Sequence, residues 1–475
     1  MSPALGCGPG GANEAEGETG DETGDGDETG DGDGDGDGEP PGCARLEGEQ
    51  PAWALRCGGP ASERVIGFGV GDSGDLFLGF ELRTLPPLEP APLQIGEFTV
   101  DADELSDIVL LALDGAGEPR WVRHFGGPGD QFLTSARVCG DGLAITGGTQ
   151  NGVIDLGEGP VEGDFVAVFD GDGELLWSRT IALGDQGYPH ATTLASVCDS
   201  AGDLLMTGRM RDGVDFGGGL LVPNEVFDGF LVRYGPGGEH LFSRLLGNVD
   251  GNSSTGSAIA LTPGGGAVVV GSFDKTVDLG GGPMTAEFGD DVLVVEYDAE
   301  GNHLWSRQFG PGGLQYGKAV AVAADGTIAV GGLFLDTIEI GDDTYENVFP
   351  NHDEDRYGTL YDGFVATLDP GGTPTWSTTI ASMLDDDVND LYFDAEGALV
   401  VGAVQEQQAV VRVFEAGAET WAWSSEPGTW LWPRFAVTPD GSVVLASGVD
   451  GEIDLGSGPL ASHGGLDMLV ARLVR

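Results

Sequence analysis

Short apolar segments separated by glycine, aspartate and proline recur along most of this chain, from about residue 49 to its end. A well-formed copy is Ala319–Gly331, in which two apolar segments flank an Asp-Gly turn. Val, Ile, Phe and Trp dominate such segments and favour strands, whereas Gly, Asp and Pro favour turns. No stretch shows the sustained 3.6-residue apolar period of a helix, so we predict an all-β protein.

These segments belong to one repeat of about 60 residues that supplies four strands. Its second half opens with an aspartate and ends in Leu-Trp-Ser-Arg, as in Asp164–Arg179 and Asp291–Arg307. Further copies open at Asp107, Asp228, Asp362 and Asp467, and a degenerate copy starts at Ala409. Seven such copies of four strands predict a seven-bladed β-propeller with four-stranded blades. We expect the strand-opening aspartates to accept backbone N–H bonds at turns.

The last copy is incomplete, because the chain ends at Arg475 before a Trp-Ser-Arg segment. The missing text stands at the other end of the repeat region, where residues 49–56 read Glu-Gln-Pro-Ala-Trp-Ala-Leu-Arg. We therefore expect this N-terminal strand to pair with Asp467–Leu473 and complete the last blade. Such closure removes two exposed sheet edges that would otherwise promote aggregation.

The repeat resembles that of the seven-bladed β-propeller family of bacterial extracytoplasmic and lipoprotein-like proteins. The motifs that carry the resemblance are the aspartate-led strand, the DxxG turn and the Leu-Trp-Ser-Arg ending, best seen in Leu304–Gly310. The resemblance covers about residues 49–475 and implies the fold. It implies little about function, because propellers support binding, scaffolding and many chemistries.

Residues 1–44 differ in composition from the rest and are dominated by Gly, Asp, Glu and Thr. We expect a disordered acidic tether here, followed by the propeller over residues 45–475. An EF-hand register starting at Asp31 fails, because Gly42 stands where the bidentate Glu is needed. Cys7 follows Ala-Leu-Gly, which is similar to the end of a truncated lipoprotein signal and predicts lipidation. The alternative is an incidental cysteine.

The charge and the cysteine content of the chain indicate which cellular compartment and which classes of partner are favoured. The chain carries 79 Asp+Glu against 20 Lys+Arg, a net charge of −59, which disfavours nucleic acid and anionic membrane surfaces. No apolar run approaches the roughly 18 residues of a membrane span. Cys43 and Cys57 could close a small disulfide loop, and Cys139 and Cys198 occupy nearly matching repeat positions. Together with the absence of zinc-type spacing, this pattern suits an exported, oxidising environment.

Two irregularities on the regular scaffold are candidate binding sites, because insertions carry functional loops. One repeat has a longer loop before its strand-opening aspartate, Asp362, than the others have. This loop contains Asp353, Glu354 and Asp355, which could hold Ca²⁺; the alternative is a solvated acidic loop. Two aromatic pairs also stand out, namely Trp421, Trp423, Trp430 and Trp432. Exposed, these rings could stack on a sugar; buried, they would pack neighbouring blades.

No nucleophile elbow, phosphate-binding glycine motif or histidine triad is present in the sequence. We therefore expect a non-enzymatic, monomeric propeller, secreted or anchored by lipid at the cell surface. It would require no cofactor and present loops around an acidic ring to an unidentified protein or glycan. One alternative is a carbohydrate-active hydrolase or lyase that uses paired carboxylates in the propeller funnel. A second is a structural surface lipoprotein with no small ligand.

Overall fold

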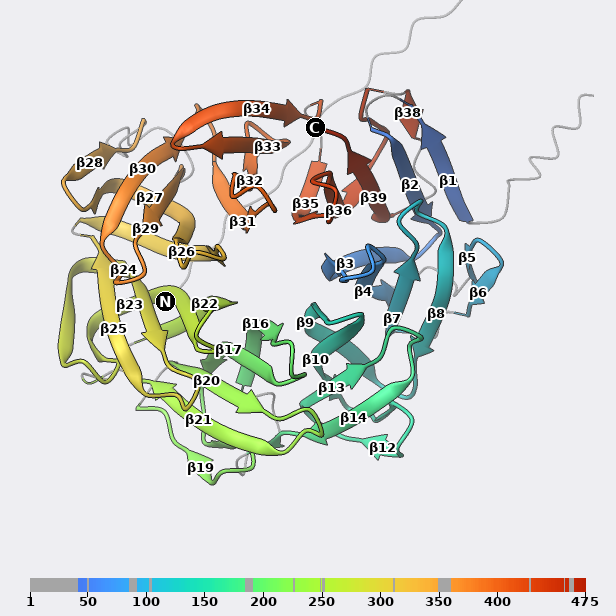
Figure 1. Ribbon diagram of the computed structural model, residues 1–475. Helices are drawn as coiled ribbons and strands as arrows, with labels where there is room; N and C mark the ends of the chain where they lie inside the picture. Colours follow the sequence, from blue (N-terminus) through green and yellow to red (C-terminus); the bar gives the residue numbers. More distant parts are fainter. Residues whose placement is uncertain are drawn as a thin grey trace, which may run out of the picture. The chain divides into compact units, whose positions relative to one another are not determined.

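The computed structural model describes residues 42–48, 51–84, 92–101, 105–183, 191–224, 227–247, 249, 253–310, 312–348, 360–426, 429–456, 458–460 and 465–475. Pro40–Arg475 form one compact unit; the other unit, Met1–Glu39, lies outside the described residues. Seven antiparallel sheets follow one another around a ring (Figure 1). The described residues contain no helix, and hence none that could span a membrane. The predicted all-β, seven-bladed propeller is confirmed.

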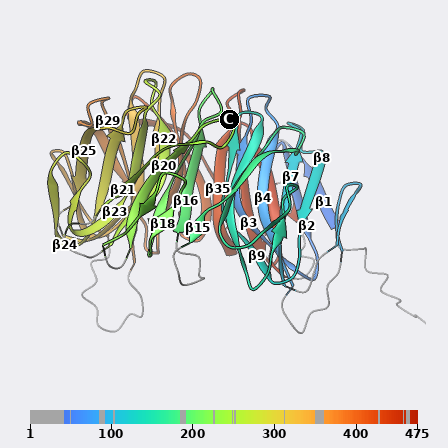
Figure 2. The same ribbon diagram turned by 90° about the horizontal axis from the view of Figure 1, so that it is seen from below.

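In blades 1 to 6 the strands follow one another in chain order from the centre of the ring outward, and they run across the thickness of the ring (Figure 2). Blade 1 consists of β3 (Ser62–Val70), β4 (Leu76–Arg83), β7 (Ser106–Leu113) and β8 (Pro119–Phe125). Blade 2 consists of β9 (Asp130–Cys139), β10 (Gly142–Gln150), β13 (Phe165–Phe169) and β14 (Leu175–Thr180). Blade 3 consists of β16 (Ala191–Cys198), β17 (Leu204–Met210), β20 (Asp228–Tyr234) and β21 (His240–Leu246).

The next three blades repeat this plan. Blade 4 consists of β22 (Ser254–Leu261), β23 (Ala267–Asp278), β24 (Pro283–Tyr297) and β25 (His303–Phe309). Blade 5 consists of β26 (Gly313–Val322), β27 (Ile328–Ile340), β29 (Asp362–Leu368) and β30 (Pro374–Ile380), and β28 (Asp343–Glu346) pairs with β27. Blade 6 consists of β31 (Asp387–Phe393), β32 (Leu399–Gln405), β33 (Gln408–Glu415) and β34 (Ala418–Ser424).

Small hairpins join the second and third strands of several blades. They are β5 (Leu93–Ile95) with β6 (Phe98–Val100), β11 (Ile154–Asp155) with β12 (Pro160–Val161), β18 (Val214–Asp215) with β19 (Leu220–Leu221), and β37 (Ile453–Asp454) with β38 (Pro459–Leu460); β15 (Ala182–Leu183) pairs with β18. An aspartate followed two residues later by glycine shapes such a turn, as in Val214–Gly217. In the copy at Asp215, one carboxylate oxygen accepts the N–H groups of Gly217 and Gly219 at 2.7 and 3.0 Å.

Blade 7 joins the two ends of the described chain. It contains β35 (Thr429–Val437), β36 (Val443–Asp450) and β39 (Asp467–Leu473), followed by β2 (Trp53–Gly58) and β1 (Gly42–Glu47). Strand β2 pairs antiparallel with β39, so the predicted closure by the N-terminal strand is confirmed. Strand β1 adds a fifth strand that the sequence did not predict. The sheet therefore begins at Gly42, within the segment expected to be tether.

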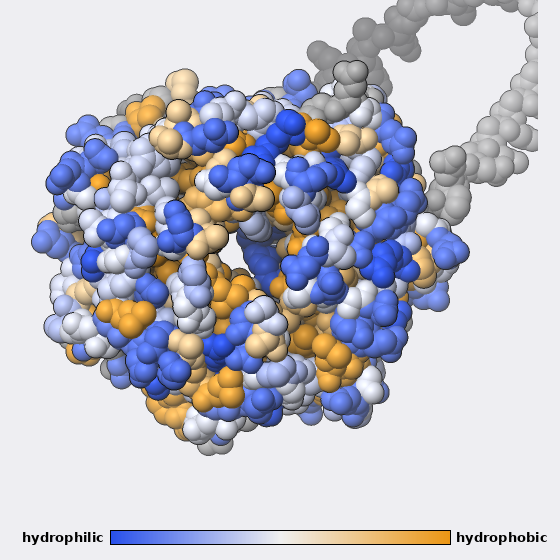
Figure 3. Space-filling model, viewed as in Figure 1, coloured by the Kyte–Doolittle hydropathy of each residue, from blue (hydrophilic) through white to orange (hydrophobic). Residues whose placement is uncertain are grey.

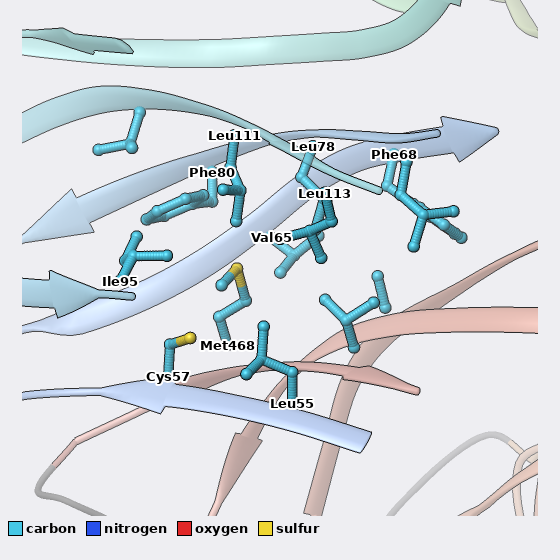
Figure 4. Packing of buried hydrophobic residues seen from close by; sticks show 14 of the residues in the cluster. Leu55, Cys57, Val65, Phe68, Leu78, Phe80, Ile95, Leu111, Leu113 and Met468 are labelled. Atoms are coloured by element: carbon cyan, nitrogen blue, oxygen red, sulfur yellow. The ribbon is translucent and has the colours of Figure 1, made fainter. Parts of the chain in front are cut away.

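Buried apolar side chains form seven clusters, one between each pair of neighbouring blades. The cluster between blades 7 and 1 brings Leu55 and Met468 against Phe68 and Phe80 (Figure 4). Because side chains alternate between the two faces of a strand, each blade buries side chains on both of its faces, against the blade before it and the blade after it. The ring is therefore stabilised by burial in every seam between blades.

The ending of the repeat, which in blade 1 is Trp121-Val122-Arg123, contacts the next blade. The ring of Trp121 lies against Gly173, a turn glycine of the following blade with φ of 75°, and a Cβ at Gly173 would lie 3.0 Å from that ring. Arg123 Nε donates to the carbonyl oxygen of Gly173 at 2.9 Å. Between blades 7 and 1, Arg45 of β1 takes the place of this arginine. Its guanidinium lies 5.8 Å from the centroid of the Trp53 ring. The repeated motif is thus a contact between blades.

Candidate functional site: the central channel

The seven inner strands, β3, β9, β16, β22, β26, β31 and β35, surround a central channel of about 710 Å³. Figure 3 shows the opening of this channel at the middle of the ring. The volume falls within the range of about 300–1,000 Å³ typical of ligand pockets. The sequence predicted the ring but did not identify the residues that line its centre.

Apolar side chains line the channel near the C-terminal end of each inner strand. They are Val70, Val138, Val197, Leu261, Val322, Phe393 and Val437. The inner strand is the first strand of every blade, so these residues gather at one end of the channel. An apolar wall of this kind favours a ligand with an apolar part.

The charged residues that line the channel reverse the balance of the whole chain. Arg137, Lys318 and Arg434 line it, and among the described lining residues Asp390 is the single carboxylate. The chain as a whole has about four acidic residues for each basic one, 79 against 20. The sequence-based expectation of an acidic ring at the binding face therefore does not describe the channel wall.

Arg137 of β9 reaches across to blade 1. A Cβ at Gly67 would lie 2.9 Å from Arg137 Nη1, so the missing side chain of Gly67 makes room for the guanidinium. Among the described residues, its one hydrogen bond is from Nη1 to the adjacent Ala136 carbonyl oxygen, at 3.1 Å. Burial lowers the pKa of Arg137, and the nearby positive charge of Arg434 lowers it further.

Arg434 and Asp390 face each other from blades 7 and 6. Arg434 Nη1 lies 3.8 Å from Asp390 Oδ1, a long ion pair, while the backbone N–H of Phe435 donates to Asp390 Oδ2 at 3.0 Å. Burial raises the pKa of Asp390, although the charges of Arg434 and Arg137 oppose this shift. Burial also raises the pKa of Tyr392, so its phenol stays a protonated hydrogen-bond donor.

β-bulges aim several polar side chains at the channel. The register of β26 shifts between Gly317 and Ala319, leaving Lys318 unpaired in the ladder, and β31 shifts in the same way around Asn389. Such bulges redirect a side chain out of the regular alternation. Lys318 forms an ion pair with Asp387 of the neighbouring blade. Lys318 and Asn389 occupy matching positions of their repeats. An alignment of the repeats is the sequence signal that could have placed them together.

The aromatic residues singled out from the sequence do not line the described channel wall. Trp421 and Trp423 lie on β34, the outermost strand of blade 6, where both are half-buried and pack against the core between blades 6 and 7. This matches the alternative in which they pack blades, and sugar binding by them stays a prediction. Trp430 and Trp432 lie on β35, but their side chains fall outside the described residues.

The predicted calcium and lipid sites stay untested. Asp353, Glu354 and Asp355 lie outside the described residues, as does Cys7. Within the part of the chain that the structure describes, no group of three His, Cys, Asp or Glu side chains could hold a metal ion.

Two disulfides are present. Cys43 is bonded to Cys57 and ties β1 to β2, where the two residues are direct partners across the ladder. Cys139 is bonded to Cys198 and joins the inner strands of blades 2 and 3. The sequence placed the second pair at matching repeat positions without indicating that the two would bond.

The strand-opening aspartates are buried, and they hold their blades in two ways. Asp228 and Asp362 accept backbone N–H bonds, from Asn224 and Val348 at 2.8 and 2.7 Å, as expected. Three of these aspartates bind a side chain of the outer strand. These contacts are Asp107 with His124 at 2.8 Å, Asp291 with Gln308 at 3.0 Å, and Asp467 with Arg56 at 2.7 Å. Their role is structural in both cases.

Two pairs of carboxyl groups interact electrostatically between blades. Burial raises the pKa of Glu63 to about 9, and the charge of Asp467 adds to the shift. Burial raises the pKa of Asp386 to about 7, with a further contribution from Asp362. All four side chains are buried and none lines the channel. These pairs are therefore removed from any substrate that enters the channel.

No family model matches the chain. The regulatory protein FlaEY of Caulobacter vibrioides is 28% identical over 172 residues, which cover 35% of this chain and 17% of that protein. The chain thus spans less than a fifth of the length of this relative.

Similar solved structures include the β-propeller domain of the Trilobed protease from Pyrococcus furiosus, with 9% identity, 86% of this chain and 93% of that chain covered, and a TM-score of 0.43. Virginiamycin B lyase from Staphylococcus aureus shows 10% identity, coverage of 87% and 95%, and a TM-score of 0.44. A protein of unknown function from Dyadobacter fermentans shows 9% identity, coverage of 88% and 96%, and a TM-score of 0.44. At these levels of identity and TM-score, none of the three bears on what this chain does.

Proposed function

We propose that this protein is a non-enzymatic, extracytoplasmic binding propeller that receives part of its ligand, a glycan or a protein segment, in the central channel. The channel itself carries the proposal: about 710 Å³ of space, apolar walls from all seven blades, and a few convergent polar groups. Pockets that bind ligands combine these properties. The two disulfides support an oxidising compartment.

The hydrolase alternative receives less support from the channel wall. A glycosidase of the usual kind needs two carboxyl groups about 5–10 Å apart on either side of the bond to be cleaved. Among the described lining residues, Asp390 has no second carboxylate beside it, and its oxygens face Arg434 and the Phe435 N–H. Binding therefore fits this wall better than acid–base chemistry.

Thermal melting of the full chain against acidic and neutral oligosaccharides and peptides tests the proposal. A ligand present at 100 times its Kd stabilises a protein by about 2.7 kcal/mol, which is a measurable rise in Tm. The matched variant is Ala260→Trp, which places an indole in the channel from β22. We expect at least one compound to raise the Tm of the natural protein but not of the variant. The proposal fails if no compound acts, or if both proteins respond equally.

A further inference from the structure

The cationic side chains of the channel are poorly neutralised by the protein itself. Arg137 and Arg434 come from blades 2 and 7, and in the described residues no carboxylate lies within 4 Å of the Arg137 guanidinium. A guanidinium has five N–H donors, of which Arg137 uses one, toward the Ala136 carbonyl oxygen. Arg434 makes no hydrogen bond to the described residues, and its ion pair with Asp390 is long, at 3.8 Å. Most of these donors are therefore available to a ligand.

The one carboxylate nearby cannot satisfy both guanidinium groups. Asp390 Oδ2 already accepts the Phe435 N–H, and Oδ1 stays 3.8 Å from Arg434. Lys318 is paired with Asp387 and contributes its charge from blade 5. Both guanidinium groups are half-buried, so their charges are partly desolvated without a close partner, and their like charges repel each other. A bound anion would relieve both costs.

We propose that the group received in the channel is an organic anion, an apolar body carrying an oxyanion that Arg137 and Arg434 hold between them. This inference rests on the proposed function, because it names the chemistry of the ligand in that same channel. Guanidinium groups bind carboxylate, sulfonate and phosphate oxygens through paired N–H donors. The apolar body would lie against the Val, Leu and Phe side chains at the end of the inner strands.

A matched pair of fluorescent probes tests the charge requirement directly. These are 8-anilino-1-naphthalenesulfonate and N-phenyl-1-naphthylamine, which is the same molecule without its sulfonate. We expect the sulfonate probe to bind the full chain about tenfold more tightly, the effect of about 1.4 kcal/mol from its charged contacts. Arg137→Gln and Arg434→Gln should each weaken the sulfonate probe by about tenfold and leave the neutral probe unchanged. Arg211→Gln, which removes an exposed arginine between β17 and β18, should affect neither.

The outcomes separate this inference from the proposed function. If Ala260→Trp abolishes binding of both probes but the arginine variants bind the sulfonate probe normally, the channel binds ligands and the anion inference is wrong. If Ala260→Trp changes neither probe, the proposed function fails as well. If inorganic phosphate displaces the sulfonate probe with equal affinity, the apolar body is not needed and the inference is overturned. Arg137→Lys keeps the charge and serves if Arg137→Gln does not fold; weakening limited to the sulfonate probe again supports the inference.

Discussion

At the scale of single residues, the structure shows which contacts the repeated motifs make. The tryptophan and arginine that end the repeat are visible in the sequence, but the contacts that they make are not. In blade 1, the ring of Trp121 packs on Gly173 of the next blade, and Arg123 donates to the carbonyl oxygen of that glycine. The strand-opening aspartates were expected to be structural, and they are, yet several also bind side chains of the outer strand. Arg56 with Asp467 is one such contact.

Gly173 should tolerate a side chain poorly because of its neighbour as well as its backbone. Gly173→Ala places a Cβ 3.0 Å from the Trp121 ring at φ 75°. Gly74→Ala is the matched control: its φ is 88° but nothing lies within 4 Å of the new Cβ. Both variants incur the left-handed backbone cost of about 1–2 kcal/mol, and Gly173→Ala about 1–3 kcal/mol more from crowding. Urea unfolding that shows equal losses would contradict this contact between blades.

Glu63 should make the folded state less stable as pH rises. Its pKa is raised to about 9 by burial and by Asp467, whereas the unfolded chain ionises it near its ordinary value of 4.5. Between these values the folded state holds a proton that the unfolded state has lost. The free energy of unfolding therefore falls by about 1.4 kcal/mol per pH unit from this group, and it is fully retained only below about pH 4.5.

Glu63→Gln removes this titration while keeping the shape of the side chain. We expect the variant to gain stability over the natural protein progressively from pH 5 to pH 9 in urea unfolding. The exposed Glu162→Gln should track the natural protein throughout. A difference that stays constant with pH would show that Glu63 is ionised in the folded state.

At the scale of elements, the closing strand was predictable because the repeat lacks one ending and supplies it elsewhere. Strand β1 was not predictable, since Gly42–Glu47 lies beside a low-complexity segment and copies no part of the repeat. Its Arg45 nevertheless replaces the arginine that β2 lacks at the seam with blade 1: Nη2 donates to the Ala116 carbonyl oxygen at 2.6 Å. The fifth strand thus supplies a contact between blades that blades 1, 3 and 4 make with an arginine of their own fourth strand.

The buried ion pair of Arg56 and Asp467 should fix β2 to β39. Both side chains are fully buried, and Arg56 Nη1 also donates to the Leu460 carbonyl oxygen at 2.7 Å. Arg56→Met leaves the carboxylate without its cation, which should cost about 3–5 kcal/mol. Arg56→Met combined with Asp467→Asn should recover much of that loss, as calorimetry can measure. A double variant no more stable than Arg56→Met alone would contradict this role.

The two disulfides should be stable features of the folded protein. The chain has five cysteines, of which four are paired, leaving Cys7. When denatured but unreduced protein is treated with a thiol-alkylating reagent, mass spectrometry should therefore detect one label, or none if Cys7 carries lipid. After reduction the protein should take up four more. A larger uptake without reductant would show that the bonds do not form.

Breaking the bond between blades should cost more than breaking the one within blade 7. The first closes a separation of 59 residues and the second one of 14. On loop entropy alone these contribute about 4 and about 3 kcal/mol. Paired serine variants compared by urea unfolding in the absence of reductant measure the two losses. The reverse order would contradict the entropic argument.

At the scale of the whole molecule, the fold followed from the sequence because one pattern recurs seven times, so that each copy supports the interpretation of the others. The channel chemistry could not be predicted in the same way. Arg137, Lys318 and Arg434 lie in three different blades and share no local motif, and a bulge brings Lys318 into the wall. The net charge of −59 pointed to an acidic binding face, because composition averages over surface and channel.

The most direct measurement is a crystal structure of the full chain grown with 4-iodobenzoate, in which iodine is located by its anomalous scattering. The account predicts an iodine peak among the apolar residues of the channel, with the carboxylate within hydrogen-bond distance of Arg137 and Arg434. Crystals of Arg137→Gln should show that peak weakened. An empty channel, or iodine found only on the outer surface of the blades, would contradict the account.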